Sequence, residues 1–262
     1  MTPDELLAKL EPLRRQMERP AWLPVIAYGD GPPEATRFGG RPLVAAGEPP
    51  PRCRRCDRRM RLLFQLNLDE MPADFDHPHD GLIRVMICTA DTCCEPRVEY
   101  LPRTAVTEGR AAAEVPPVDL TWATRHVVGW DEVTALPTGD DQRELFGVEF
   151  LEDSEGDDLE FVIRWPDGEI RGDFQDERLW EILEDYDGEG FLPPFDRLGV
   201  YPVWHDEPHW PDCPTCGRRM RHLMGVGAGS DDRPDLLAWG LGVLRLFQCV
   251  EHAGQIRCSR QM

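Results

Sequence analysis

The sequence lacks the apolar run of ~20 residues that a membrane-spanning helix needs, which argues against an integral membrane protein. It also lacks the basic and then apolar start of a signal peptide, so we expect a cytoplasmic protein. Basic residues are few: 29 Lys and Arg stand against 49 Asp and Glu, for a formal net charge of −20. This balance argues against a general basic face for nucleic acid or anionic lipid.

Sequence motifs of catalysis are absent as well. The chain has no Walker loop, no G-x-G-x-x-G, no nucleophile elbow and no H-E-x-x-H. The acidic segment 167–178 has Gly172 in the sixth place of a calcium loop, but Arg171 and Arg178 occupy ligand positions, so it is not an EF-hand. A catalytic site assembled only in three dimensions stays open.

Cysteine, by contrast, is abundant for a cytosolic chain, with nine residues. Four of them form two C-x2-C pairs, Cys53 with Cys56 and Cys213 with Cys216. Such a pair favours metal binding, because a tight knuckle aims both sulfurs at one point. The alternative is a thiol–disulfide active site. That motif usually occurs once, at a helix N-terminus, whereas each pair here precedes a predicted strand.

The cysteine pairs belong to a longer repeat. Two segments recur at offsets of 160 and 161 residues: 58–61 (Arg-Arg-Met-Arg) at 218–221, and 82–88 at 243–249. The longer segment ends in a cysteine both times, Cys88 and Cys249, at nearly the same distance from its knuckle. We therefore predict an internal duplication in which a cysteine-bearing strand returns to each knuckle.

Each half needs a fourth ligand to complete a tetrahedral zinc shell. In the second half His252 completes a set of three cysteines and one histidine, with Cys258 as the alternative. In the first half the candidates are Cys93 and Cys94, and adjacent side chains diverge, so one metal ion rarely takes both. Four nitrogen or sulfur ligands leave no open position, so we expect two structural Zn²⁺ ions per chain.

We predict an α+β, β-rich fold, internally duplicated, with two zinc-knuckle modules flanking an acidic insert. The expected parts are an N-terminal helix (1–19), a first zinc-bearing half (20–130), the acidic insert (131–190) and a second zinc-bearing half (191–262). Apolar spacing predicts helices over 3–18 and 176–186. Strands are expected at 60–68, 82–88, 125–130, 145–151 and 159–165, and irregular backbone over the Pro- and Gly-rich stretch 20–51.

The negative charge is concentrated in the insert. Residues 131–189 hold 22 Asp and Glu against 4 Arg, a net −18, whereas the remainder holds 27 acidic and 25 basic residues, a net −2. A concentrated negative field can attract a basic protein and disfavour wrong partners. The alternative is an ordinary solubilising face.

Several motifs resemble the bacterial YwqG-like domain of unknown function. They are 38–42 (Phe-Gly-Gly-Arg-Pro), 51–56, 64–68, 196–202, 213–217 and 247–252. The likeness covers residues 20–262, is greatest to the zinc-bearing branch, and favours Cys94 as ligand, because Cys94-Glu95 matches a Cys-Glu pair of that family. The order of knuckle, strand and cysteine is also similar to the programmed-cell-death-two group, which escorts a newly made basic ribosomal protein. Some YwqG-like proteins occur beside toxins, which implies an immunity role.

Together these features favour a non-enzymatic zinc-binding interaction protein whose acidic surface binds a basic protein, either a toxin that it neutralises or a nascent client that it chaperones. One alternative is a hydrolase or transferase with a site in the cleft between the two halves. The other is nucleic-acid binding through the Arg-rich first knuckle, which the acidic composition disfavours.

Overall fold

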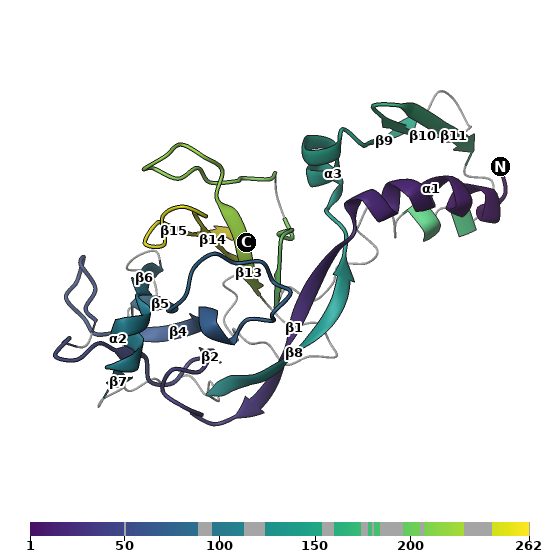
Figure 1. Ribbon diagram of the computed structural model, residues 1–262. Helices are drawn as coiled ribbons and strands as arrows, with labels where there is room; N and C mark the ends of the chain where they lie inside the picture. The colour runs from purple at the N-terminus through teal and green to yellow at the C-terminus, as the bar shows by residue number, and fades with distance from the viewer. Residues whose placement is uncertain are drawn as a thin grey trace.

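The computed structural model describes residues 1–49, 51–88, 96–112, 124–153, 160–173, 178–179, 181–183, 196–204, 207–227 and 243–261. The protein is β-rich, and most of its strands form one antiparallel ten-stranded sheet in the order β15-β14-β13-β12-β1-β8-β2-β4-β5-β6 (Figure 1). Its strands are β1 (Arg19–Tyr28), β2 (Arg37–Phe38), β4 (Met60–Asn67), β5 (Leu82–Cys88), β6 (Arg97–Leu101), β8 (Arg125–Ala135), β12 (Arg197–Gly199), β13 (Arg221–Val226), β14 (Val243–Gln248) and β15 (Ile256–Gln261). The edge strands β6 and β15 lie close together, so the sheet nearly closes on itself.

The centre of the sheet is a long hairpin-like ribbon of β1 and β8. The prediction of irregular backbone over 20–51 was therefore wrong for β1, whose Pro20 and Pro24 suggested a loop. Both prolines pair with β8, but only Ala21 and Trp22 pair with β12 on the other side. A proline without an N–H is tolerated there because β1 has no second partner beyond those two residues.

The four strands on either side of this ribbon have matching registers. In the first half Arg37 pairs with Gln65, and Arg84 pairs with both Gln65 and Glu99. The same positions in the second half, 160 or 161 residues later, pair in the same way. The strand β4 shifts register between Leu62 and Phe64, and β13 shifts between His222 and Met224. Even the irregularity of the sheet therefore recurs.

Apolar side chains on the inner face of the sheet form the main core. They come from both halves and include Phe64, Val85, Leu198, Leu223 and Leu246. The two metal-ligand clusters lie outside this core, at the ends of β4–β5 and β13–β14. Smaller elements complete this body: β3 (Leu43–Val44), which pairs with β7 (Arg110–Ala111), the 3-10 helix η1 (Leu68–Glu70) and the helix α2 (Arg103–Thr107).

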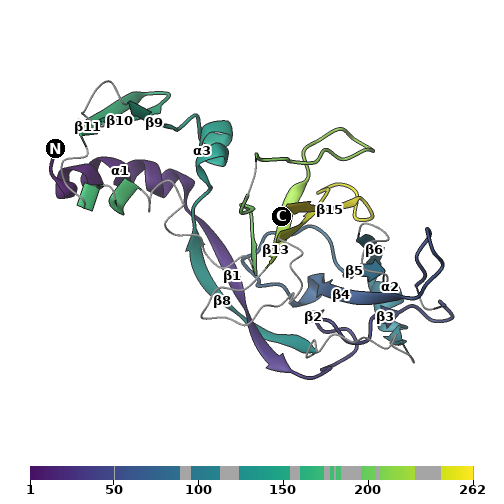
Figure 2. The ribbon, with the colours of Figure 1, turned by 180° about the vertical axis from the view of Figure 1, so that it is seen from behind.

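A second, smaller body stands at the far end of the β1–β8 ribbon (Figure 2). We call it the helix–sheet lobe; it comprises α1 (Pro3–Met17), the sheet of β9 (Glu149–Asp153), β10 (Glu160–Trp165) and β11 (Gly168–Asp173), and the helical residues 178–179 and 181–183. The lobe has its own core, in which Leu6, Leu10 and Leu13 of α1 pack with the apolar face of the sheet. Thr2 and Glu5 form a capping box that starts α1.

The acidic insert is thus built partly into the lobe and partly into the ribbon. Residues 131–135 continue β8 and pair with β1. The predicted strand 145–151 was wrong over its first half, because α3 (Gly139–Phe146) precedes β9 and ends at Gly147 in the left-handed conformation. Of the predicted helix 176–186, the described residues are helical, and the others lie outside the described part of the chain. None of the described helices is long and apolar enough to span a membrane.

Candidate metal centres

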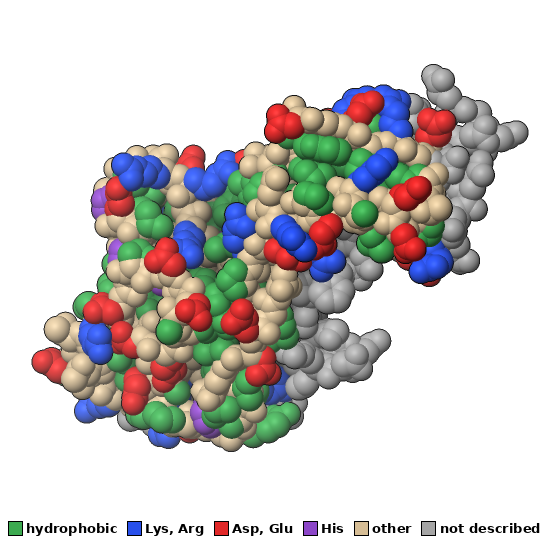
Figure 3. Space-filling model, turned by 45° about the vertical axis from the view of Figure 1, so that its right-hand side comes forward, with side chains coloured by type: hydrophobic (Ala, Val, Ile, Leu, Met, Phe, Trp, Pro, Cys, Tyr) green, Lys and Arg blue, Asp and Glu red, His purple; other side chains and the backbone are tan. Residues whose placement is uncertain are grey.

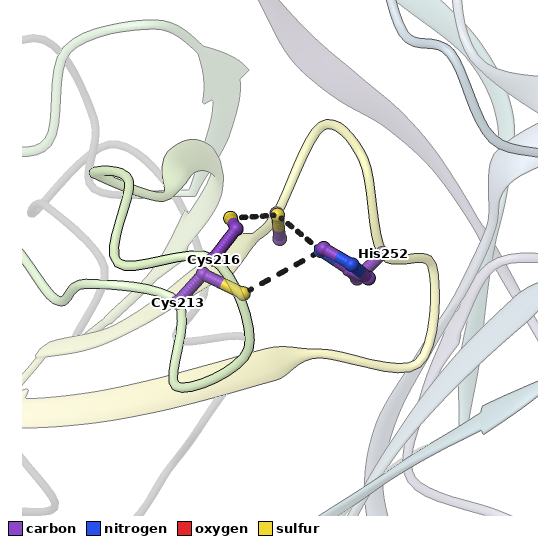
Figure 4. Close-up of side chains that lie close together, drawn as sticks. Cys213, Cys216 and His252 are labelled. Atoms are coloured by element: carbon purple, nitrogen blue, oxygen red, sulfur yellow. Dashed lines mark hydrogen bonds between the residues drawn. The ribbon is translucent and has the colours of Figure 1, made fainter.

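The second knuckle brings four ligand atoms together at one end of β14. The cluster contains Cys213, Cys216, Cys249 and His252, whose ligand atoms all lie within 4.8 Å of one another. The sulfurs of Cys216 and Cys249 are 3.7 Å apart, and Nδ1 of His252 lies 3.4 Å from the sulfur of Cys249 and 3.8 Å from that of Cys213 (Figure 4). The knuckle and the turn after β14 therefore converge on one point.

These spacings fit a tetrahedral zinc ion. Bonds of ~2.3 Å to sulfur and ~2.0 Å to nitrogen place two sulfurs about 3.8 Å apart, and a sulfur and a nitrogen about 3.5 Å apart. Two of the three cysteines are buried and the other two residues are partly buried, so all four ligand positions are filled by protein. A zinc ion held in this way would cross-link the knuckle to β14 and supply no open position for a reactant.

The backbone turns of the two knuckles are the same. The N–H of Cys53 donates to the carbonyl of Arg58 at 2.8 Å, and that of Cys213 donates to Arg218 at 2.8 Å. The next turn closes with Asp57 N–H on the carbonyl of Cys53 and with Gly217 N–H on Cys213. Residues 57 and 217 have positive φ values of 56° and 70°. The sequence repeat therefore encodes a repeated turn that aims the sulfurs.

Hydrogen bonds to sulfur favour ionisation of the second knuckle. Burial opposes the thiolate of Cys213, but N–H groups of Cys216 and Thr215 and the neighbouring thiols outweigh it and lower the Cys213 pKa to about 6. The N–H of Arg218 favours the thiolate of Cys216, yet burial and the thiols of Cys213 and Cys249 outweigh that bond and raise its pKa. These hydrogen bonds favour the thiolate of Cys213, which is the form that binds metal.

The first knuckle brings together three ligands among the described residues. Cys53, Cys56 and Cys88 have all their sulfurs within 4.8 Å, and the sulfurs of Cys56 and Cys88 are 3.4 Å apart. Cys53 and Cys88 are buried, whereas Cys56 is exposed. The two candidates for the fourth position, Cys93 and Cys94, lie outside the described residues. Both clusters can hold a metal ion.

Cys258 lies apart from the second cluster. It belongs to β15, pairs with Leu246 and packs against the main core. Successive residues of a strand point to opposite faces of the sheet, so the position of Cys258 aims it away from the knuckle. Of the two alternatives for the fourth ligand, the structure brings His252 to the cluster.

The surroundings of the second cluster include residues that sequence reasoning missed. Trp204, Trp210 and Phe247 pack against its cysteines. The indole N–H groups of Trp204 and Trp210 donate to the two carboxylate oxygens of Asp141, at 2.9 and 2.8 Å. Asp141 is fully buried on α3, so this carboxylate attaches α3 to the second half. One acidic residue among many in the insert gave no sequence signal for this role.

Burial governs the charge of Asp141. Loss of hydration raises its pKa to about 6, although the two indole hydrogen bonds act in the opposite direction. Nearby, Arg219 pairs with Glu144 of α3 and lies over the ring of Trp210. Helix α3 is therefore held by a buried carboxylate and an exposed ion pair, and its Phe146 packs against Tyr201.

A loop of the first half also reaches the second cluster. Nε2 of His79 lies 2.8 Å from the carbonyl oxygen of Cys249, and Arg221 lies over the ring of Phe75. Burial, with a smaller contribution from Arg221, lowers the pKa of His77 to about 4. This loop packs the two halves together on the side of the second cluster.

The sequence of the chain matches one family model over a defined span of residues. No curated protein matches the chain. The sequence model of a family described as a domain of unknown function (DUF1963) matches residues 36–244, which include both knuckles and the described strands from β2 to β13. On that match over most of its length, the chain belongs to the DUF1963 family.

Proposed function

We propose that the protein is a non-enzymatic interaction protein stabilised by two structural zinc ions, and that its acidic lobe binds a basic protein. The observation that carries the metal assignment is the complete four-ligand cluster of the second half. Its spacing suits zinc, and filled coordination favours a structural ion over a catalytic one. In the first half the same role falls to Cys53, Cys56 and Cys88 with Cys94 as the proposed fourth ligand.

The two halves, in this proposal, arose by duplication and belong to the zinc-bearing YwqG-like branch of the family. The matched registers support the duplication, as do two equivalent side-chain bonds. Thr36 Oγ1 accepts from Asn67 N–H at 3.0 Å, and Asp196 Oδ1 accepts from Gly227 N–H at 2.9 Å, 160 residues later in each position. A shared arrangement of this kind extends beyond the cysteines themselves.

Metal analysis of the purified protein tests the first part. We expect close to two zinc ions per chain by plasma mass spectrometry, and one after Cys216→Ser. In the first half, Cys94→Ser should lose a zinc ion while Cys93→Ser keeps both. Protein with no zinc and with disulfides at the knuckles would instead support thiol–disulfide chemistry.

The position of the helix–sheet lobe supports the second part of the proposal. The lobe stands clear of the main sheet and has a core of its own. Exposed carboxylates lie on its strands, turns and helical residues, among them Glu160, Asp167 and Glu181. On the face shown in Figure 3, Asp and Glu also occur on the main body, and basic side chains lie among them in both places. A test of the lobe must therefore compare it with the body.

Charge reversal makes that comparison. A partner is first identified by affinity capture from the native cell, and its association rate is then measured at two salt concentrations. Replacing Glu160, Asp167 and Glu181 by lysine should slow association several-fold at low salt, with less effect once screening shortens the Debye length to ~8 Å. Zinc content and unfolding should not change.

The matched control reverses three exposed carboxylates of the main body: Glu34, Asp74 and Glu108. It makes the same change in net charge, so a site on the lobe predicts little effect on the association rate. Equal slowing by both variants would show that net charge alone acts. No slowing by the lobe variant would make the insert a solubilising face.

The structure gives no comparable support to an active site. Among the described residues, the most displaced carboxyl and imidazole pKa values belong to Asp141 and His222. Burial is the largest cause in both, raising the pKa of Asp141 to about 6 and lowering that of His222 to about 3. Both side chains are almost fully covered and bond to neighbouring protein groups. Displaced pKa values therefore reflect packing here.

A further inference from the structure

One row of side chains differs sharply between the two halves. In the first half it crosses four paired strands as Arg37, Gln65, Arg84 and Glu99. In the second half the equivalent row is Arg197, Gly225, Arg245 and Ser259. The arginines are retained, whereas the glutamine is replaced by glycine and the glutamate by serine. The second row therefore keeps its positive charges and contains no carboxylate of its own.

Both rows lie on the outer face of the sheet. The residues beside the second row, Leu198, Met224 and Leu246, point into the main core, so the row itself points away from it. Backbone covers this row, because Arg197 donates to the carbonyl of Tyr201 at 3.2 Å and Arg245 donates to that of Val203. The first row is covered in the same way by the backbone near Leu43.

In the first half the buried charge of Arg84 is neutralised. Arg84 is almost fully buried and forms ion pairs with Glu48 and with Glu99, the latter at 2.7 Å. Burial lowers the pKa of Arg84, but the hydrogen bonds and charges of these carboxylates outweigh it and raise the pKa. Gln65 fills the neighbouring position. Its Oε1 accepts a hydrogen bond from a backbone N–H, and its Nε2 donates to two backbone carbonyl groups.

In the second half Arg197 differs from its equivalent, Arg37. Burial lowers the pKa of Arg37, but nearby carboxylates, chiefly that of Asp30, oppose this effect, whereas burial alone acts on Arg197. Its side chain is 1% exposed, and its Nη1 has no hydrogen-bond partner among the described residues. No described carboxylate forms an ion pair with it, and burial lowers its pKa to about 10. Gly225 lies directly opposite it in the ladder, where the first half has a glutamine. Arg197 is thus a buried cation that has no counter-charge among the described residues, and it lies beside a position that has no side chain.

Burying an unpaired charge costs several kcal/mol, so such an arrangement calls for an anion. We propose that the second row is an oxyanion site, in which Arg197 and Arg245 bind a phosphate or carboxylate group over Gly225. Planar guanidinium groups suit both ligands, because each can donate two parallel hydrogen bonds to a pair of oxygens. Arg245 brings a second cation to the row and lies over the ring of Trp204, at 4.8 Å from its centre.

His222 lies next to this row and carries no charge. Nδ1 of His222 lies 2.7 Å from the carbonyl oxygen of Gly199, to which it donates, while Nε2 has no hydrogen-bond partner among the described residues. Burial, together with Arg197 and Arg245, keeps this ring neutral at physiological pH. The positive charge at the site therefore comes from the arginines.

Ligand-dependent stability tests the proposal on the full zinc-loaded chain. Thermal unfolding is measured in up to about 20 mM inorganic phosphate, in acetate, and in chloride at matched ionic strength. A site with a Kd near 1 mM should raise the unfolding midpoint by about 4 °C. A response to phosphate alone assigns a phosphate ligand, a response to acetate alone assigns a carboxylate, and a response to neither overturns the proposal.

Two variants locate the effect. Arg197→Met should abolish the ligand-dependent shift, whereas Arg15→Met, which removes an exposed arginine of α1, should retain it. Gly225→Glu places a carboxylate opposite Arg197, at a register position where the first half accommodates glutamine, so it should fold and lose the response. A full shift in Arg197→Met or in Gly225→Glu would place the anion elsewhere and contradict the proposal.

Discussion

The first and second halves have the same strand registers and knuckle turns, yet their metal clusters have different surroundings. In the first half the cluster packs against Met60, Leu62 and Met86, and Cys56 is exposed. In the second half tryptophan and phenylalanine side chains cover it, and α3 is attached through Asp141. The backbone brings the candidate metal ligands together in the same way in both halves, whereas the side chains around the two clusters differ. The second cluster, unlike the first, packs against side chains that bind α3.

The largest expected effect comes from breaking one centre at a time. Cys249→Ser and Cys88→Ser remove equivalent strand cysteines, each buried. Zinc binding contributes on the order of 10 kcal/mol to the folding of such modules, so each variant should lose one zinc ion and unfold locally. Hydrogen exchange should rise in β13–β14 for the first variant and in β4–β5 for the second.

The comparison predicts a further asymmetry between these two variants. Cys249→Ser should also release α3, because the tryptophans that bind Asp141 pack on the second cluster. Protection of amides in α3 should therefore fall in Cys249→Ser and stay unchanged in Cys88→Ser. Equal loss of α3 protection in both variants would show that the halves unfold as one unit.

The next effect concerns the two rows of buried arginines. Arg84→Met leaves Glu48 without its ion-pair partner and leaves Glu99 with Arg97 alone, so it should cost about 3 kcal/mol of unfolding free energy. Arg197→Met removes a buried charge that has no ion pair among the described residues, so in phosphate-free buffer it should leave the unfolding free energy unchanged or raise it. Urea unfolding of both variants measures the difference. Similar costs would mean that Arg197 has a charge partner after all.

The repeated parts of the molecule were predictable from its sequence. The helix at 3–18 and the strands at 60–68 and 82–88 were confirmed to within a residue of their ends, because a cap and apolar spacing define them. The knuckle cysteines come together as the spacing indicates. Signals of this kind can be read from the sequence because the residues that form each cap, strand or knuckle lie close together in the chain.

The contacts between distant segments were not predictable. Pro20 and Pro24 suggested irregular backbone where β1 lies, because the strand conformation of these residues depends on pairing with β8, more than 100 residues away. Asp141 resembled its acidic neighbours in sequence, and only the fold brings it to Trp204 and Trp210. The arginine rows become visible once strand registers are known, since hydrophobic patterning does not mark a buried arginine.

A smaller effect should reveal the attachment of α3 through its pH dependence. The Asp141 pKa is raised from 3.8 to about 6, so the folded state favours the protonated carboxyl. Its contribution to stability is therefore full below pH 4 and decreases as the pH rises through about 6. Relative to Asp141→Asn, the wild type should lose about 1 kcal/mol of unfolding free energy between pH 5 and pH 7.5.

The comparison with Asp141→Asn cancels effects of pH on the metal centres, which both proteins share. Urea unfolding at the two pH values, with zinc content checked at each, measures the difference. An unchanged difference between wild type and variant would indicate that the indole hydrogen bonds keep the carboxylate ionised throughout. The opposite slope would contradict the direction of the pKa shift.

The smallest expected effect distinguishes the two knuckles themselves. Residue 57 has the left-handed conformation with an aspartate, whereas residue 217 has it with a glycine. A non-glycine residue pays roughly 1 kcal/mol for this conformation, although the Asp57 side chain recovers part of it through a 3.0 Å bond to Arg52. Asp57→Gly should therefore change the unfolding free energy by less than about 0.5 kcal/mol. Gly217→Asp should destabilise the protein by about 1 kcal/mol, because the second knuckle has Asp212 at the position of Arg52 and so offers the new aspartate no arginine. Urea unfolding of the reciprocal pair checks both values. A stabilisation of about 1 kcal/mol in Asp57→Gly would show that the Arg52 bond contributes nothing, and the two turns would then differ only in strain.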